Sequence, residues 1–231
     1  GSKIMTNTRA INVITKLNLD THEEITKRLI VRPLNWFNLK EHFENIPFLC
    51  RKVGKDLILA VYILLNDDRE NGLLQTKVLP LEIIEEWDKD EDEIFALALE
   101  NTQNYAPARL YTNIFDIEHT PEPEADFMAD EFQRNKIRKD VTLLVTTKRK
   151  TNGAIAMFYP GVKERLAELL DGNYYVAFTS IHEAMIHREG EIDPITIRRN
   201  VRETNRIFGP DETLTNEVWF FNKENGTFEE I

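Results

Sequence analysis

The stretch VTLLVTTKRKTNGAIAMFYPGVKERLAELLDGNYYVAFTSIHEAMIH, residues 141–187, decides the fold class. In it, short apolar runs bounded by turn residues flank one amphipathic helical pattern. That pattern places Val162, Leu166 and Leu169 on one face, between Pro160 and Gly172, which are typical start and stop residues of a helix. The apolar runs predict four strands, at residues 141–146, 154–159, 174–179 and 184–187.

A second helix and a hairpin are predicted after this stretch. Asp193 is a typical N-cap, and Pro194 suits the first position of a helix that runs to about Phe208. Asn225-Gly226 is typical of a tight turn between strands at 217–222 and 227–231. The C-terminal half therefore has the predicted order β-β-α-β-β-α-β-β.

The N-terminal half also mixes helices and strands. Helical spacing predicts helices within the first thirty residues and at 39–43. Residues 56–65 are apolar on both faces and predict a central strand, with 73–79 as its hairpin neighbour. A helix follows the acidic run 82–93. The predicted fold class is α+β, with two mixed α/β halves and largely antiparallel or mixed sheets.

An acidic segment divides these halves. Residues 116–131 contain two prolines, seven acidic residues and no Lys or Arg, which is typical of a surface linker. We predict an N-terminal half at 1–115, a linker at 116–138 and a C-terminal half at 139–231. The alternative is that the two halves pack together as one domain.

Composition excludes several classes of protein. The 231 residues carry a net charge of -11, which opposes binding to nucleic acids and to anionic membranes. No apolar run approaches the length of roughly 18 residues that a membrane span needs. The single cysteine, Cys50, precludes a disulfide within the chain and favours a reducing compartment, so we expect a cytoplasmic protein.

Three neighbouring residues have the right types for hydrolytic chemistry. Ser180, His182 and Glu183 could act as nucleophile, base and orienting group, although a Gly-x-Ser-x-Gly motif is missing. The alternative is a polar turn in which Ser180 or Glu183 bonds the local backbone. His182 and His187 are five residues apart, a spacing that does not bring two ligands to one metal. We predict no metal site, and no motif indicates a cofactor.

Polar residues on two helices are further candidates. Asn101 and Asn205 lie on otherwise apolar helix faces, where an amide either ties the helix to its neighbours or faces a ligand. Arg198, Arg202 and Arg206 form a cationic stripe, with Arg199 beside it. This stripe could receive an acidic partner, a carboxylate or a phosphate, or it could be a solvated face.

Several short motifs occur in a fixed order along the chain. They are Arg32-Pro33-Leu34-Asn35, Ile46-Pro47, residues 56–61, residues 99–102 with Pro107, Asn152-Gly153-Ala154 to Tyr159-Pro160-Gly161, Ser180-Ile181-His182-Glu183 and residues 201–206. Together they resemble an uncharacterised bacterial family known only as a domain of unknown function, of a type found in gut bacteria. The resemblance starts near residue 25, and the Ser-Ile-His-Glu motif departs from the family pattern because Phe178-Thr179 precede it. The resemblance implies a cytoplasmic bacterial protein and supplies no activity.

The sequence favours a non-enzymatic binding module whose arginine stripe and acidic surface serve a protein partner. The alternative is a hydrolase-like enzyme with a pocket near Ser180, His182 and Glu183, to which Asn101 or Asn205 contributes. Nucleic-acid binding would require the basic segments 134–139, 148–150 and 198–206 to merge into one surface. The oligomeric state is not predicted.

Overall fold

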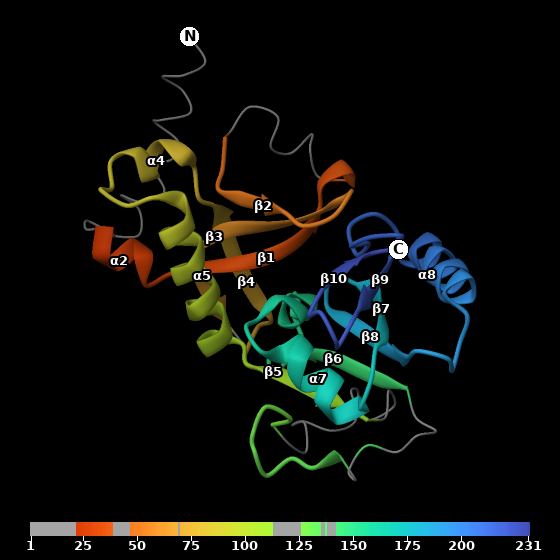
Figure 1. The fold of residues 1–231 in the computed structure, drawn as a ribbon. Helices are drawn as coiled ribbons and strands as arrows, with labels where there is room; N and C mark the ends of the chain where they lie inside the picture. The colour runs from red at the N-terminus through yellow and green to blue at the C-terminus, as the bar shows by residue number, and fades with distance from the viewer. Residues whose placement is uncertain (1–21, 39–46, 69, 113–125, 135–136, 138–141) are drawn as a thin grey trace. The chain divides into compact units, whose positions relative to one another are not determined.

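The computed structural model describes residues 22–38, 47–68, 70–112, 126–134, 137 and 142–231 (Figure 1). Helices and antiparallel sheets contribute in similar proportion, which confirms the α+β class. The helix predicted at 39–43, the one predicted in the first twenty residues and most of the linker lie outside the described residues.

The chain folds as two compact units that interleave in sequence. The described part of the first unit consists of residues 22–32, 47–53 and 58–105, without residue 69. The described part of the second unit begins with two short segments, 33–38 and 54–57, and continues from residue 106 to 231 with the gaps given above. The second unit therefore includes two short segments of the N-terminal half of the sequence.

The first unit is built on β3, which the sequence predicts as the central strand. Its residues 57–63 are all buried, and the sheet order β1-β3-β2, with β4 also paired to β3, confirms its central position. The helix α5 packs its buried Ile94, Ala98 and Thr102 inward. The elements are α2 (His22–Thr26), β1 (Leu29–Asn35), β2 (Cys50–Lys52), β3 (Leu57–Asp68), β4 (Leu73–Val78), α4 (Leu81–Glu85) and α5 (Glu91–Tyr105).

The second unit contains a six-stranded antiparallel sheet, of order β10-β9-β7-β8-β6-β5 (green to blue in Figure 1). The predicted helices and the terminal hairpin are present within two residues of their expected bounds. The elements are β5 (Ala108–Tyr111), β6 (Leu143–Thr147), a 3-10 helix η2 (Gly153–Phe158), α7 (Val162–Leu170), β7 (Tyr174–Ser180), β8 (Glu183–Arg188), α8 (Pro194–Phe208), β9 (Val218–Phe221) and β10 (Phe228–Glu230).

Helices cover both faces of β7. On one face, Ala177 packs with Ile197 and Val201 of α8. On the other, Phe178 stacks on Phe158 of η2, with ring centroids 5.9 Å apart, and the Tyr174 hydroxyl donates to a carbonyl of α7. Successive residues of a strand point to opposite faces, so β7 lies in the middle of the core.

The strand predicted at 154–159 is wrong, because η2 occupies this segment. Residues 153–157 are all buried, and Asn152 before them adopts a left-handed conformation with φ of 54°. A short apolar run that is buried on every side has neither the period of a strand nor that of a helix, so its pattern is ambiguous. Packing against β6 and β8 determines the local structure instead.

Residues 126–134, within the predicted linker, pack into the second unit. Phe127 and Phe132 are buried. Arg165 of α7 donates to the carbonyl oxygens of both, at 2.9 and 2.7 Å, and to that of Ala129 at 3.1 Å. One guanidinium therefore fixes this irregular segment on α7.

Candidate functional site

The turn between β7 and β8 holds the three residues with hydrolytic potential. Ser180 ends β7 and Glu183 begins β8, and the pairing of the two strands shifts between Ala177 and Ser180. The Ser180 hydroxyl oxygen accepts a hydrogen bond from the backbone N–H of His182 at 3.0 Å. The turn is therefore closed by its own serine, which is the structural alternative that the sequence leaves open.

The imidazole of His182 joins two other parts of the second unit. Its Nδ1 accepts from the backbone N–H of Asn152 at 2.9 Å, and its Nε2 lies 2.9 Å from Glu212 Oε2. These partners place the proton of the neutral ring on Nε2. The carbonyl oxygen of His182 accepts from the Thr146 hydroxyl at 2.7 Å. One residue thus connects β6, the start of η2 and the segment after α8.

This geometry differs from that of an activated serine. A serine nucleophile needs its hydroxyl on a histidine nitrogen that can take the proton. Here the two ring nitrogens of His182 bond Asn152 and Glu212, and Ser180 bonds the backbone. The structure brings the three candidates into one turn without a hydrogen bond from the Ser180 hydroxyl to the His182 ring, so a catalytic role for them stays a prediction.

Glu183 is the most perturbed acid of this turn. Burial raises the pKa of its carboxyl above the usual value, while the hydrogen bond from the Thr179 hydroxyl, 3.3 Å long, and the nearby His182 lower it. Protonation of this carboxyl is thereby favoured. A half-buried acid with a raised pKa is common both at functional sites and in structural turns.

Both candidate asparagines make hydrogen bonds that fix backbone segments. In the first unit, the Asn101 amide donates to the carbonyl oxygens of Thr26 and Leu29, at 2.8 and 3.1 Å, and so ties α5 to α2 and β1. In the second unit, the Asn205 amide donates to Thr215 O at 3.0 Å and to Asn216 Oδ1 at 2.9 Å. Its own Oδ1 is buried without a hydrogen-bond partner in the part of the chain that the structure describes.

A polar cluster around Asp56 also fixes residues 214–215. Asp56 Oδ1 accepts from the buried Thr215 hydroxyl at 2.8 Å, and Asp56 Oδ2 lies 3.3 Å from the Asn35 amide nitrogen, which also donates to Leu214 O at 3.0 Å. Sequence reasoning missed these residues, because 159 positions separate Asp56 from Thr215. Only the fold brings them together.

The exposed face of α8 carries three arginines. Ile195, Arg199, Arg202 and Arg206 are spaced four, three and four residues apart, so they form one stripe along the helix. All four are exposed. Among the described residues none forms an ion pair with these three arginines, and we call them the arginine face.

Arg198, which the sequence places in the stripe, lies at its margin. Its Nε is 3.8 Å from Glu217 Oε2, and its Nη2 donates to the carbonyl oxygen of Ile231. Arg199, and not Arg198, lies on the exposed side of α8. The difference arises because Arg198 lies close to the buried face of Val201 and Asn205, next to Glu217 and Ile231.

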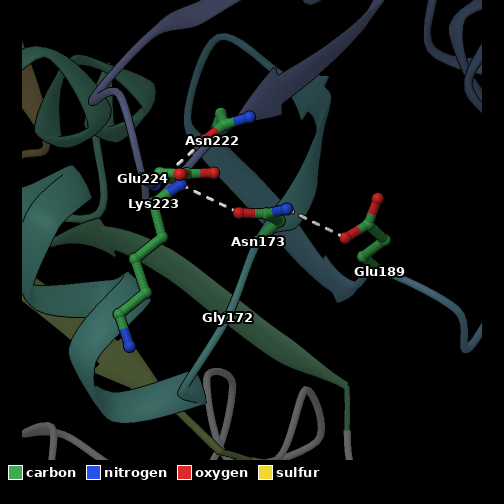
Figure 2. A pocket seen from close by; sticks show the side chains of 6 residues that line it. All are labelled: Gly172, Asn173, Glu189, Asn222, Lys223 and Glu224. Carbon is green, nitrogen blue, oxygen red and sulfur yellow. Dashed lines mark hydrogen bonds between the residues drawn. The ribbon is translucent and has the colours of Figure 1, made fainter.

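A shallow pocket of about 480 Å³ lies elsewhere in the second unit, at the turn between β9 and β10 (Figure 2). Asn173 is its central side chain. Its amide accepts from Lys223 N at 2.8 Å and donates to Glu189 Oε2 at 2.9 Å. Because these polar groups bond one another, the pocket offers few free partners to a ligand. No sequence-predicted candidate lines it.

Over the described residues, no group of three or more His, Cys, Asp and Glu side chains is placed to hold a metal ion. Across the same ranges, no helix is both long and apolar enough to cross a bilayer.

A family model matches residues 3–223, nearly the whole chain. The chain belongs to DUF5688, a family of unknown function. This confirms the resemblance to a domain of unknown function. Neither the curated proteins nor the solved structures gave a match to this DUF5688 chain. Its candidate site must therefore be interpreted from its own geometry.

The close packing of Gly153 against Thr146 and His182 should require a glycine at this position. A Cβ atom there would overlap the Thr146 hydroxyl and the His182 carbonyl oxygen, and would lie 2.9 Å from Thr147 N. We expect Gly153→Ala to lower the free energy of unfolding by about 1–3 kcal/mol, the usual cost of overpacking a core. The measurement is urea unfolding followed by circular dichroism.

Gly172→Ala is the matched control, because a Cβ at Gly172 meets nothing within 4 Å. Its effect should stay within about 0.5 kcal/mol, as for ordinary surface substitutions. Equal stability of the two variants would contradict the close packing described at Gly153.

The ionised Glu183 carboxylate should destabilise the fold at neutral pH. The pKa of this carboxyl is raised in the folded state, so its ionisation lowers the free energy of unfolding at a pH above that pKa. This loss of stability vanishes as the pH falls below the pKa of the same glutamate in the unfolded chain. We expect Glu183→Gln, which keeps an acceptor for Thr179, to melt at a higher temperature than the wild type at about pH 7. The gain should shrink towards about pH 4, where a free glutamate is half protonated.

The control for this pH dependence is Glu224→Gln at the exposed turn after β9. Its effect on the melting temperature should be small, because the Glu224 side chain is exposed. A Glu183→Gln variant that is less stable than the wild type at neutral pH would contradict the view that ionisation of the half-buried Glu183 carboxyl destabilises the fold.

Proposed function

We propose that this DUF5688 protein is a non-enzymatic binding module that captures an acidic segment of a partner protein on the arginine face of α8. The observation that supports this is the set of three exposed arginines, Arg199, Arg202 and Arg206, which lack ion-pair partners among the described residues. Guanidinium groups bind carboxylates through two parallel hydrogen bonds, so a row of them suits a run of Asp or Glu.

The arrangement of these charges has a cost. Arg202 is three residues from Arg199 and four from Arg206, and like charges at such spacings destabilise a helix by a few tenths of a kcal/mol each. Glu203, four residues after Arg199 and three before Arg206, offsets a part of this cost. Arg206 lies in the last turn, where it favourably opposes the helix dipole. That benefit does not extend to Arg199 and Arg202, which an acidic partner would neutralise.

The net charge of -11 is compatible with an acidic partner. At physiological ionic strength, charges more than about 8 Å apart are largely screened, so the local arginines dominate at contact. The overall charge still disfavours long polyanions such as duplex DNA, which would cover acidic as well as basic surface.

A second candidate is the hydrolase-like function at the β7–β8 turn. One observation favours it, namely the raised pKa of the half-buried Glu183 beside His182 and Ser180. In this case ligand binding would require His182 and would not require the arginines of α8. Single substitutions at these positions can therefore distinguish the two candidate functions.

The test of the binding function is fluorescence anisotropy with a labelled oligoglutamate peptide at physiological ionic strength, where the net negative charge of the chain is screened. We expect Arg202→Glu to weaken binding at least about tenfold, because one charge-assisted hydrogen bond of about 1.5–3 kcal/mol is replaced by repulsion. Arg202→Lys should have an intermediate effect, since it keeps the charge but loses the paired hydrogen bonds.

Lys52→Glu on β2 is the control for net charge, because it makes the same charge change at an exposed position in the first unit. It should change the affinity by no more than about twofold, because Lys52 does not belong to the arginine face. Absence of peptide binding, or equal losses in Arg202→Glu and Lys52→Glu, would refute the proposal. Loss of binding in His182→Ala alone would support the second candidate.

A further inference from the structure

A row of three rings crosses the sheet of the second unit. Tyr175 of β7 is paired with His187 of β8 on one side and with Phe220 of β9 on the other, so the three side chains point to the same face. The Tyr175 and Phe220 ring centroids are 5.2 Å apart. All three side chains are half-buried, so part of each ring is open to solvent. We call these three residues the ring row.

Helix α8 begins beside the ring row and leaves it partly uncovered. The helix packs on Ala177 and Val218, the next residues of this face, and Tyr175 lies at the edge of that cluster. Burial raises the pKa of the Tyr175 hydroxyl, and the nearby carboxylates of Glu189 and Asp193 raise it further. One of these carboxylates caps α8 and the other lines the pocket at the β9–β10 turn. The ring row therefore lies between the start of the helix and the pocket.

The pocket supplies a second, polar row on the same face of the sheet. Asn173, Glu189 and Asn222 are each two residues from a member of the ring row, which corresponds to about 7 Å along a strand. The Glu189 N–H donates to Asn173 O at 3.2 Å, so the pairing of β7 and β8 continues to this row. All three residues line the pocket of about 480 Å³, and Figure 2 shows Asn173 between Glu189 and the turn. We call them the polar row.

The few groups that remain free beside this pocket include both donors and acceptors. Asn222 Oδ1 accepts from the backbone of the turn at 2.9 Å, so the amide nitrogen is left as a donor. Glu189 Oε2 accepts from Asn173 at 2.9 Å, which leaves Oε1 as an acceptor. Among the described residues neither free atom has a hydrogen-bond partner, and the same holds for the Tyr175 hydroxyl. The other polar groups hold the site in place, and a site that is ordered before binding loses less conformational entropy.

From these observations we infer that the ring row and the polar row together form a binding site for a neutral saccharide. A pyranose ring has an apolar C–H face that packs on an aromatic ring, and its hydroxyls both donate and accept hydrogen bonds. A cationic ligand also suits aromatic rings and the Glu189 carboxylate, but it only donates and would leave the Asn222 amide unused. An anionic ligand is disfavoured because Lys223 Nζ, the ammonium at this pocket, is bonded to Asp171 at 3.0 Å.

The experiment is an NMR titration of the isotope-labelled full chain with three neutral tetrasaccharides, of β-linked glucose, β-linked xylose and α-linked glucose. We expect at least one of them to shift the backbone amides of residues 173–175, 187–189 and 220–224, with a dissociation constant of about 1–10 mM or lower. Sorbitol is the control ligand, because it carries hydroxyls but no ring that can stack. It should leave these amides unchanged at the same concentration.

Two substitutions of Tyr175 separate stacking from hydrogen bonding. Tyr175→Leu keeps apolar bulk against α8 but removes the aromatic face, and it should weaken saccharide binding at least about tenfold. Tyr175→Phe keeps the ring and loses one neutral hydrogen bond, so it should weaken binding only about threefold. Phe37→Leu is the matched control, because Phe37 is a ring of the same unit that is 59% exposed, and it should have no effect.

Glu189→Ala tests the polar row at an exposed position, where the substitution does not disturb the core. It removes the free acceptor and should weaken binding at least about threefold. Thermal melting checks that every variant is folded, and Glu189→Ala keeps the inference testable if Tyr175→Leu does not fold.

The inference is overturned if none of the three saccharides shifts these amides, if the shifts occur elsewhere, or if Tyr175→Leu and Glu189→Ala bind as tightly as the wild type. Tetramethylammonium is titrated in parallel, and shifts at the ring row with this cation alone would replace the saccharide by a cationic ligand. The site shares no residue with the arginine face and does not depend on the proposed function. Arg202→Glu should therefore leave saccharide binding unchanged, which keeps failure of one proposal distinct from failure of the other.

Discussion

The hydrogen bonds of the Asp56 carboxylate are the interaction on which the second unit depends most. Three segments that are remote in sequence meet there, because Asp56 accepts from the Thr215 hydroxyl while Asn35 contacts both Asp56 and Leu214 O. Hydrogen bonds to a charged group contribute about 1.5–3 kcal/mol each, twice as much as neutral ones. The segment between α8 and β9 is thereby fixed at its C-terminal end, and so is the position of residues 35–38 beside it.

His182 fixes the same segment at a second point. Its ring lies 2.9 Å from Glu212, and the backbone N–H of Ile181 donates to Glu212 O, also at 2.9 Å. The residues that look most catalytic in the sequence therefore link a strand turn to the loop after α8. The helix itself packs through Ile197, Val201 and Asn205, which leaves its opposite face exposed to solvent. The exposed cationic face of this helix supports the proposed binding of an acidic segment.

Local signals in the sequence predict much of this fold. Asp193 caps α8 as expected, since its carboxylate accepts from Ile195 N at 2.7 Å, and Pro194 occupies the first turn. The Asn225-Gly226 turn and the central strand β3 are also predicted, because each depends on neighbouring residues or on a long apolar run. The segment 153–158 is mispredicted, since its short buried run has no period that distinguishes a strand from a helix.

The features that position the candidate site could not be predicted in this way. The contact between Asp56 and Thr215 spans 159 residues, and that between Asn38 and Pro210 spans 172. Glu212 lies thirty positions from His182 in an irregular segment, where no period indicates which side chain faces the ring. The sequence indicates the stripe on α8, but the exposure of Arg199 in place of Arg198 depends on the contacts of Arg198 with Glu217 and Ile231.

Binding of an acidic segment at α8, and not at the β7–β8 turn, can be tested by titrating isotope-labelled protein with the oligoglutamate peptide and following the backbone amides by NMR. Chemical-shift changes should concentrate at Arg199, Arg202 and Arg206. Changes concentrated instead at Ser180, His182, Glu183 and Glu212, with α8 unaffected, would refute binding at α8 and would favour a functional site at the turn.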